Sequence, residues 1–538
     1  AASLLSIAAF DIPTEFPEDV LKQAREATPS KAPREDLTQI PLITIDPHDA
    51  RDHDDAVWAE ELKDGWRVIV AIADVSAFVT DGSALDREAW KRGNSTYFPD
   101  RVVPMLPEEL SADACSLREG ENRACMAVEL IFDKAGTKRS HRFIRGTMRS
   151  AAKLSYEEAQ AAIDGNPNGK GAEMLEPVLK PLWGAYAALT AARERRGPLE
   201  LDLPERKVII GKDGRVEAIR IRERFDAHKL IEEMMIQANV AAAETLEKAK
   251  HPLLYRVHDQ PTDAKIAALA DFLKTMQIKW PLGERPQPSR FNKLLLDHAG
   301  TESSNMISEI VLRSQSQAVY APDNLGHFGL NLKKYAHGTA PIRRYADLIV
   351  HRALIAAMEL GDDGLTDKAA LQLEETATHL VTCERRSMAA ERSATDRYLA
   401  LFLADRVGAE FEGRITGVTR AGLFVRLDET GADGFLPISK LSDDYWIHEE
   451  AAQALVARRS GKRFELGMRV RVELAEAAPL TGGILLKMLS APKPGKAWKH
   501  GDKPTRSGST SNSGKGRKKS KRTTPKHKRK AQARARDK

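Results

Sequence analysis

Five aspartates crowd into ten residues near the beginning of the chain, directly after the β-branched run Ile43-Thr44-Ile45. They are Asp46, Asp49, Asp52, Asp54 and Asp55. Ionised carboxylates this close together raise one another's pKa, so such a loop needs metal ions or basic side chains to neutralise it. Oxygen ligands favour hard divalent cations such as magnesium or manganese, and a pair of these ions commonly serves to hydrolyse a phosphodiester.

This acidic loop has two other interpretations. An EF-hand calcium loop requires Gly at its sixth position and Glu at its twelfth, but counted from the first aspartate these are Arg51 and Val57. A solvated acidic turn remains the alternative. Residues 57–59 and 66–73 are typical of two strands, joined by a hairpin turn at residues 63–65. The loop therefore lies between strands of a predicted sheet, which is a rigid support for catalytic ligands.

A second segment, nearly three hundred residues later, carries complementary positive charge. It reads Tyr335-Ala336-His337-Gly338-Thr339-Ala340-Pro341-Ile342-Arg343-Arg344-Tyr345-Ala346-Asp347. Pro341 suits the first turn of a helix, so Arg343 and Arg344 are expected near a helix N-terminus, where free N–H groups and the helix dipole favour anions. This pattern predicts a phosphate-binding arrangement, with an ordinary basic helix start as the alternative.

Together the two segments resemble the RNB catalytic domain of the RNase II and RNase R family. The resemblance rests on Thr44-Ile45-Asp46-Pro47, on Asp52-His53-Asp54-Asp55-Ala56 and on the later Pro341-Ile342-Arg343-Arg344-Tyr345 motif. Residues 71–76, 97–107 and 227–233 agree with the RNase R members in particular. The similarity extends from the first residues to about position 490.

The resemblance assigns the catalytic roles. Asp46, Asp52, Asp54 and Asp55 match the four catalytic aspartates of the family, which hold one or two magnesium ions; manganese is the alternative cation, and Asp49 is additional to the set. Arg343 matches the essential arginine, whose guanidinium can bind phosphate oxygens and stabilise developing charge.

The resemblance also implies residues that contact RNA. Tyr97 matches an aromatic residue that stacks on a base near the scissile end, with a core tyrosine as the alternative. Arg344 is a further RNA-binding candidate, and Glu391 matches a glutamate near the substrate path, to which no chemical role is assigned. Family members commonly have aromatic-Thr-Ser-Pro where this chain has Gly338-Thr339-Ala340-Pro341. We expect the lost ring and hydroxyl to alter substrate binding rather than abolish function.

The expected architecture is an α+β RNB catalytic domain, in which helices surround a mixed sheet, followed by an all-β S1-type OB-fold barrel and a disordered basic tail. The expected segments are a lead-in at residues 1–33, the RNB domain at 34–365, a helical connection at 366–406, the S1-type domain at 407–490 and the tail at 491–538. A helical pattern at residues 368–405 supports the connection.

The barrel is predicted because, after this helix, the spacing of apolar residues changes from a helical period to alternation. Residues 408–418, 422–427 and 434–438 alternate apolar with polar side chains between glycine turns. This segment resembles the S1-type OB fold, in which Phe424 and Phe435 are candidates for stacking on RNA bases. Barrel core positions are the alternative for both rings.

The tail accounts for the basic character of the chain. Residues 491–538 hold eighteen Lys and Arg against two Asp, a net charge of +16, whereas the whole chain has +6 and the remainder therefore about −10. With almost no apolar residues the tail is expected to be disordered. It is typical of an arm that binds nucleic acid or the ribosome, with a solubilising or localisation tail as the alternative.

Composition excludes several other classes of protein. The three cysteines show no CxxC spacing and indicate neither a zinc site nor a disulfide framework. No apolar run approaches transmembrane length and the chain does not open like a signal peptide, so a cytoplasmic monomer with no membrane partner is expected. Because the chain begins with Ala, in a segment resembling the join before an RNB domain, the cold-shock domains usual in RNase R-like proteins are expected to be missing upstream.

The sequence therefore predicts a magnesium-dependent 3′→5′ exoribonuclease that degrades single-stranded RNA processively to nucleoside 5′-monophosphates. Direction and processivity are implied by the resemblance. The alternatives are an RNA-binding regulator that has lost cleavage and a ribosome-associated factor that acts through the barrel and the tail.

Overall fold

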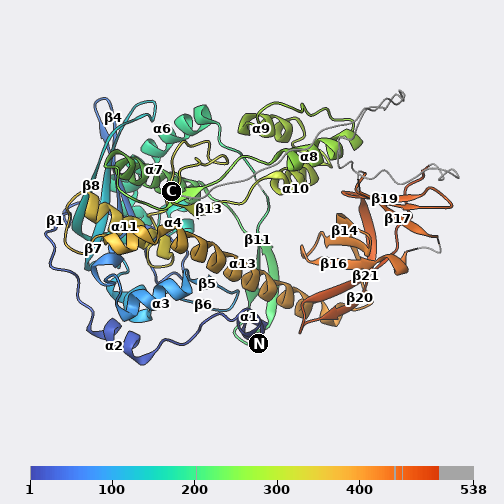
Figure 1. Cartoon of the computed structure of the whole chain (residues 1–538), viewed down its shortest axis with the longest axis horizontal. Helices are drawn as coiled ribbons and strands as arrows, with labels where there is room; N and C mark the ends of the chain where they lie inside the picture. The colour runs from blue at the N-terminus through green and yellow to red at the C-terminus, as the bar shows by residue number, and fades with distance from the viewer. Residues whose placement is uncertain (1, 202, 442–443, 451, 496–538) are drawn as a thin grey trace, which may run out of the picture.

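The computed structural model describes residues 2–201, 203–441, 444–450 and 452–495. Figure 1 shows a large sheet with its helices at one end of the molecule, a small barrel at the other, and the long helix α13 (Leu373–Leu403) between them. The predicted disorder of the tail falls, from residue 496 onward, outside the described residues.

The larger unit is built on a seven-stranded mixed sheet, which confirms the predicted fold class. Its strand order is β1-β8-β7-β4-β3-β2-β9; the outer pairs β1–β8 and β2–β9 are parallel and the pairs between them antiparallel. The strands are β1 (Glu35–Asp36), β2 (Ile43–Asp46), β3 (Asp55–Leu62), β4 (Gly65–Ala73), β7 (Asn122–Asp133), β8 (Lys138–Arg149) and β9 (Ala152–Ser155).

The hairpin predicted beside the acidic loop is present. β3 and β4 pair from Asp55 opposite Ile72 to Leu62 opposite Gly65, so β3 begins two residues earlier than predicted. At Gly65 an added Cβ would lie 1.9 Å from the carbonyl oxygen of Phe132 on β7. Only glycine fits this close approach, which brings β4 against its second neighbour.

Helices and short elements surround the sheet, and the main core joins strand residues such as Val70 to Ala242 of α7 and Leu348 of α11. The helices are α2 (Glu18–Glu26), α3 (Ala84–Arg92), α4 (Tyr156–Ile163), α5 (Gly169–Met174), α6 (Lys180–Arg196), α7 (Asp226–Lys248) and α11 (Tyr345–Ala357). Two small sheets pair β5 (Thr96–Tyr97) with β6 (Val102–Val103) and β12 (Tyr255–Val257) with β13 (Val319–Ala321). In the described part of the chain, no helix has both the length and the apolar character needed to cross a membrane.

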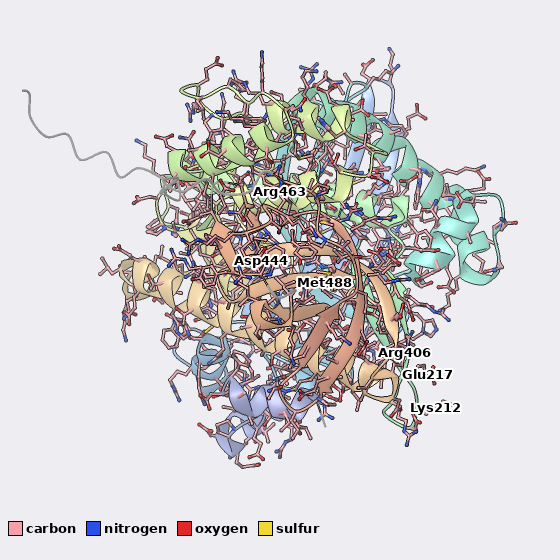
Figure 2. The ribbon with its side chains drawn as sticks, turned by 90° about the vertical axis from the view of Figure 1, so that its right-hand side faces the viewer. Lys212, Glu217, Arg406, Asp444, Arg463 and Met488 are labelled. Atoms are coloured by element: carbon pink, nitrogen blue, oxygen red, sulfur yellow. The ribbon has the colours of Figure 1, made fainter. Side chains whose placement is uncertain are left out.

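Two segments of the larger unit contact the barrel. A lobe of α8 (Asp263–Thr275), α9 (Pro288–Asp297) and α10 (Ser304–Ser314) has its own core, and Arg313 of α10 donates a hydrogen bond to the carbonyl of Thr416 at 2.8 Å. A hairpin of β10 (Arg206–Ile210) and β11 (Val216–Ile221) places Val208 in the barrel's hydrophobic cluster. Figure 2 labels Lys212 and Glu217 of this hairpin at the lower right, and Arg206 of β10 donates a hydrogen bond to the carbonyl of Asp428 in the barrel region at 3.1 Å.

The predicted helix at residues 368–405 is interrupted. It consists of α12 (Asp367–Leu371), α13 and a final 3₁₀ turn, Ala404–Arg406. Gln372 has ψ of 8° and donates its N–H to Ala369, three residues back, at 3.1 Å. The segment is therefore helical as predicted, with a break at this residue, because the tighter turn interrupts the regular hydrogen-bond ladder.

The C-terminal unit is a closed barrel, as predicted. Its strand order is β14-β15-β16-β21-β20, and the three predicted strands agree with β14 to β16 within two residues. The barrel strands are β14 (Glu410–Thr419), β15 (Gly422–Leu427), β16 (Asp433–Pro437), β20 (Arg469–Ala478) and β21 (Gly483–Met488). A separate sheet of β17 (Trp446–Glu449), β18 (Ala454–Ala457) and β19 (Arg463–Glu465) is inserted between β16 and β20.

Candidate active site

The acidic loop joins two strands of the sheet, so its ends are held in place. Asp46 is the last residue of β2 and lies beside Ser155 of β9, while Asp55 is the first residue of β3. The carbonyl of Asp54 accepts a hydrogen bond from the N–H of Ala73 on β4 at 2.8 Å. Four strands therefore fix the backbone from which these carboxylates project.

Asp54 and Asp55 lie where burial and neighbouring carboxylates disfavour the ionised form. Asp54 is 4% exposed, and its burial, with the nearby charges of Asp52 and Asp55, raises its pKa well above the usual value despite Arg343. Burial and the charge of Asp46 raise the pKa of Asp55 to about 8. A cation at this position would relieve both effects.

The arginine motif meets the acidic loop although Ile342 lies 288 residues after Asp54. The N–H of Ile342 donates to Asp54 Oδ1 at 2.9 Å, and Arg343 Nε lies 3.7 Å from Asp54 Oδ2. The Arg343 side chain is 46% exposed. The two segments on which the sequence hypothesis rested are therefore joined at Asp54, and the guanidinium remains open to a ligand.

The predicted helix start at Pro341 is wrong. The helix α11 begins at Tyr345, and Arg344 is extended, with φ of −138° and ψ of 121°. Arg344 forms an antiparallel bridge with Asn94, because the carbonyl of Arg343 accepts the N–H of Ser95 at 3.0 Å. Pairing with this distant segment delays the helix, so Arg343 is presented by a turn rather than by a helix N-terminus.

Tyr97 and Glu391 lie next to each other at the same site. The Tyr97 hydroxyl donates to Asp52 Oδ2 at 3.2 Å, and the Tyr97 N–H donates to Glu391 Oε1 of α13 at 2.7 Å. The Tyr97 side chain is 40% exposed, so the alternative of a core tyrosine is wrong. Its role in base stacking stays a prediction.

A cavity of about 230 Å³ adjoins this site. Its lining includes Tyr97, Tyr320, Arg343, Arg344, Glu384 and Glu391. It therefore combines guanidinium groups, which suit phosphate, with aromatic rings, which suit a base. Arg344 lines the cavity, but both its Nε and Nη2 donate to Asp347, at 2.9 and 2.8 Å.

The four predicted metal ligands have the right chemistry but do not converge as they stand. Carboxylate oxygens suit magnesium or manganese, and burial together with neighbouring carboxylates raises the pKa of both Asp54 and Asp55. Among the described residues, however, no three acidic, His or Cys side chains are grouped so as to hold a metal ion. Asp46 Oδ2 lies 2.6 Å from His53 Nδ1, and Asp52 accepts from Tyr97. Each of these contacts engages one oxygen of its carboxylate, Oδ2 in both residues.

Two residues of the site were missed in the sequence. His53 is 4% exposed and contacts Asp46, and its place between Asp52 and Asp54 was the available signal. Asp347 is fully buried and binds Arg344, and its spacing three residues after an arginine could have indicated this pair.

Gly338 stands where family members commonly have an aromatic residue. It is buried, on the core side of the turn that carries Arg343. The Gly338 N–H donates to Asn239 Oδ1 at 2.8 Å, and its carbonyl accepts from His351 Nε2 at 2.7 Å. An added Cβ would lie 3.2 Å from Val350 Cγ1, next to an enclosed void of about 10 Å³. An effect of Gly338 on substrate binding would therefore act through core packing.

The barrel presents Phe424 and Phe435 side by side on β15 and β16. The two residues are opposite each other in the register, and their ring centroids are 5.2 Å apart. Phe424 is 40% exposed and Phe435 is partly exposed, so the alternative of two core rings is wrong. Base stacking on this pair stays a prediction.

Comparison with known proteins agrees with this architecture. The RNB domain family matches residues 34–359, and the S1 RNA binding domain family matches residues 404–486. Ribonuclease R of Escherichia coli K12 is 40% identical over 487 residues, which are 87% of this chain and 60% of the relative. Ribonuclease R of Aquifex aeolicus is 41% identical over 472 residues, 86% of this chain and 66% of the relative.

A solved structure has a similar fold over most of the chain. The structure of Mycoplasma genitalium RNase R in complex with ribose methylated single-stranded RNA is 29% identical, with a TM-score of 0.86, and the match covers 90% of this chain and 77% of that one. The chain spans about 60% of the length of the Escherichia coli relative. Because the RNB match covers more than half of the residues and includes both segments that meet at Asp54, the chain belongs to the RNB domain family.

Proposed function

We propose that this chain is a 3′→5′ exoribonuclease that hydrolyses single-stranded RNA processively to nucleoside 5′-monophosphates, with magnesium as its cation and manganese as a substitute. The observation that carries the proposal is the contact of Asp54 with Ile342 and Arg343, which joins the aspartate cluster to the arginine motif. Membership of the RNB family and relatives named Ribonuclease R support it.

Each group at the site has a distinct task in this proposal. Asp46, Asp52, Asp54 and Asp55 would hold the magnesium, which when bound activates water and neutralises charge on the phosphate. Arg343 binds the non-bridging phosphate oxygens, since its exposed guanidinium lies beside Asp54. Tyr97 stacks on the base next to the scissile phosphate, and Glu391 holds the backbone of Tyr97 in place.

The barrel and the tail supply further RNA contacts in this proposal. The S1 RNA binding domain match covers the barrel that carries Phe424 and Phe435. The charge of +16 in residues 491–538 suits phosphate backbones, including those of ribosomal RNA. We assign the chain to the cytoplasm as a monomer on the sequence arguments above.

The experiment that tests the function uses RNA labelled at its 5′ end. Incubation with the chain and magnesium should give a short labelled product without a ladder of intermediates, together with free nucleoside 5′-monophosphates. Labelled mononucleotide at early times would contradict the direction of hydrolysis. Intact RNA that the chain still binds would contradict the enzyme and favour the RNA-binding regulator.

Removal of divalent cations should abolish hydrolysis. A chelator leaves the carboxylate cluster without its counter-charge, so turnover should fall below detection and return on adding magnesium or manganese. Fluorescence anisotropy should show that RNA binding survives, because the barrel and tail contacts need no metal. Hydrolysis that continues in excess chelator, in protein shown to be metal-free by mass spectrometry, would rule out the metal-dependent mechanism.

Replacing Phe424 with Ala should weaken RNA binding by about 1–3 kcal/mol, the usual contribution of one stacked base. The measurement is the dissociation constant for single-stranded RNA in chelator, by anisotropy. Leu480→Ala is a matched control, since Leu480 is also in the barrel region and is 74% exposed but offers no ring. Equal affinity of the Phe424 variant and the control would remove Phe424 from the RNA-binding surface.

A further inference from the structure

We propose that Asp347 is a positioning residue for hydrolysis: it folds the turn that presents Arg343 to Asp54, and Arg344 holds Asp347 rather than RNA. This inference rests on the proposed function, because it assigns a role within the same site. It also replaces the sequence expectation that Arg344 binds RNA.

The carboxylate of Asp347 closes the turn through three hydrogen bonds. It is fully buried in the first turn of α11. Its Oδ1 accepts the N–H of Ala340 at 2.8 Å and Nη2 of Arg344 at 2.8 Å, while its Oδ2 accepts Nε of Arg344 at 2.9 Å. One side chain thus ties the beginning of the turn to its end.

The backbone position of Arg343 depends on Ala340, the residue whose N–H is bound by Asp347. The N–H groups of Arg343 and Arg344 both donate to the carbonyl of Ala340, at 3.3 and 3.0 Å. Asp347 in turn binds the N–H of the same Ala340. The next N–H along the turn, that of Ile342, donates to Asp54. A shift of Ala340 would therefore move both the Arg343 guanidinium and the amide that contacts Asp54.

Arg343 and Arg344 line the cavity, and a third arginine, Arg256, binds Glu384 of the same lining. Arg256 binds Glu384 through both Nη1 and Nη2, at 2.9 and 2.8 Å. Arg344 binds Asp347 in the same two-bond manner. Arg343 has only the 3.7 Å approach to Asp54 among its charged contacts in the described structure. Among these three arginines of the described structure, Arg256 and Arg344 each hold a carboxylate through two N–H groups, which leaves Arg343 to bind phosphate.

The test measures kcat, KM and RNA affinity for Asp347→Ala, Asp347→Asn, Arg344→Ala and the double Ala variant. Misplacing a catalytic group by about 1 Å can cost on the order of 100-fold in rate. We expect kcat of the three single variants to fall by about 10- to 100-fold, while the dissociation constant measured in chelator stays within about twofold. The kcat of the double variant should be no lower than that of the less active single variant, because both replacements break the same Arg344–Asp347 ion pair.

A matched control separates positioning from general loss of stability. Asp363→Asn breaks another two-bond pair, Asp363 with Arg145 at 2.6 Å, in the segment after α11. It should lower the melting temperature but leave kcat at 25 °C unchanged. If Asp347→Ala does not fold, Asp347→Asn carries the test, because its amide oxygen can still accept the Ala340 N–H while its NH₂ group faces Arg344.

Two results would overturn the inference. If Arg344→Ala weakens RNA binding and flattens the salt dependence while kcat at saturating RNA is unchanged, Arg344 is a phosphate ligand. If amide exchange at Ala340 is no faster in Asp347→Ala than in the unmodified chain, Asp347 does not hold the turn. The exchange experiment needs no activity, so an inactive unmodified chain would contradict the proposed function alone.

Discussion

Replacement of Asp54 by Asn should lower RNA turnover by on the order of 10³-fold or more while RNA binding is retained. Asn can still accept the Ile342 N–H through its side-chain oxygen, so the contact between the loop and the turn survives. It cannot supply the negative charge that a divalent cation needs. A bound metal stabilises phosphoryl transition states by several kcal/mol, and each 1.36 kcal/mol changes the rate tenfold.

The same replacement should raise the melting temperature in chelator. Burial raises the pKa of Asp54 above its value in an unfolded chain, so at neutral pH ionisation of this carboxyl opposes folding. A neutral isostere removes that cost, as expected where function is maintained at the expense of stability. Calorimetry and single-turnover kinetics measure the two effects.

Asp49→Asn is the matched control for Asp54→Asn. Asp49 lies in the same loop but is exposed and is additional to the four aspartates that match the family. Its replacement should leave turnover within about twofold, since it removes only screened surface charge. Equal losses for the two variants would mean that overall loop charge, rather than a specific ligand, supports hydrolysis.

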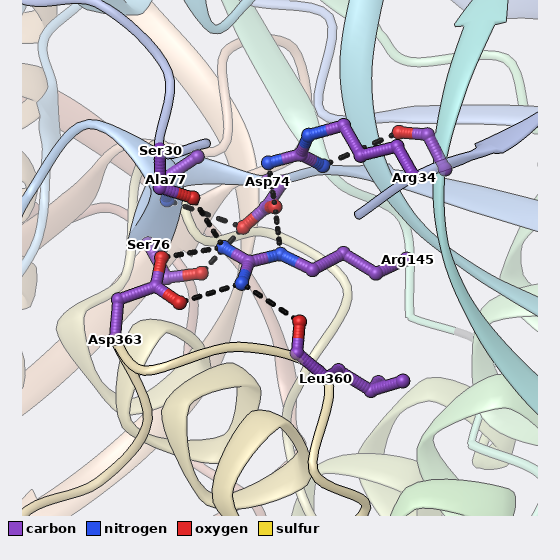
Figure 3. Close-up of polar contacts among 9 residues, drawn as sticks. Ser30, Arg34, Asp74, Ser76, Ala77, Arg145, Leu360 and Asp363 are labelled. Carbon is purple, nitrogen blue, oxygen red and sulfur yellow. Dashed lines mark hydrogen bonds and ion pairs between the residues drawn. The ribbon is translucent and has the colours of Figure 1, made fainter. Parts of the chain in front are cut away.

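Replacement of Asp74 by Asn should lower the free energy of unfolding by about 3–5 kcal/mol, the usual cost of breaking a buried ion pair. Figure 3 shows Asp74 between two arginines: Nη2 of Arg34 and Nε of Arg145 each lie 2.8 Å from Asp74 Oδ2. Arg145 also binds Asp363 and the carbonyl of Leu360. Asp74 directly follows β4, so this network anchors the strand that pairs with Asp55 to the segment after α11.

This loss should depend on pH in a defined direction. Burial alone would raise the pKa of Asp74, but Arg145, Arg34 and the hydroxyl of Ser76 outweigh it and hold the pKa below 3.8. A lowered folded pKa means that the ion pair stabilises the fold fully above about pH 4 and progressively less as the pH falls through the folded value. The difference in unfolding free energy between Asp74→Asn and the unmodified chain should therefore be constant from pH 5 to 7 and shrink below pH 4.

Asp113→Asn is the control for that measurement. Asp113 forms an ion pair with Arg118 at 2.7 Å, but its side chain is 60% exposed. Exposed pairs contribute about 0–1 kcal/mol, so denaturant unfolding should detect little change. A similar small loss for Asp74→Asn would show that water reaches the Asp74 network.

The sequence alone determined those features that depend on neighbouring residues. The β-branched run before Asp46 and the glycine turn at residues 63–65 were sufficient to place the acidic loop between strands. The alternation of apolar and polar residues between glycine turns was sufficient to predict β14 to β16 of the barrel. Side-chain period and turn chemistry are local properties, so they can be recognised before any packing is known.

The pairing of distant charges could not be read from the sequence and depends on the folded arrangement. Arg343 and Arg344 are adjacent in the sequence and were both expected to bind RNA, yet Arg343 faces Asp54 and Arg344 binds the buried Asp347. The start of α11 at Tyr345 likewise depends on the bridge between Arg344 and Asn94. These outcomes depend on which segments the folded core brings together. The buried carboxylate of Asp347 is too costly to leave unpaired and therefore binds Arg344, whereas the half-exposed guanidinium of Arg343 stays open to a ligand.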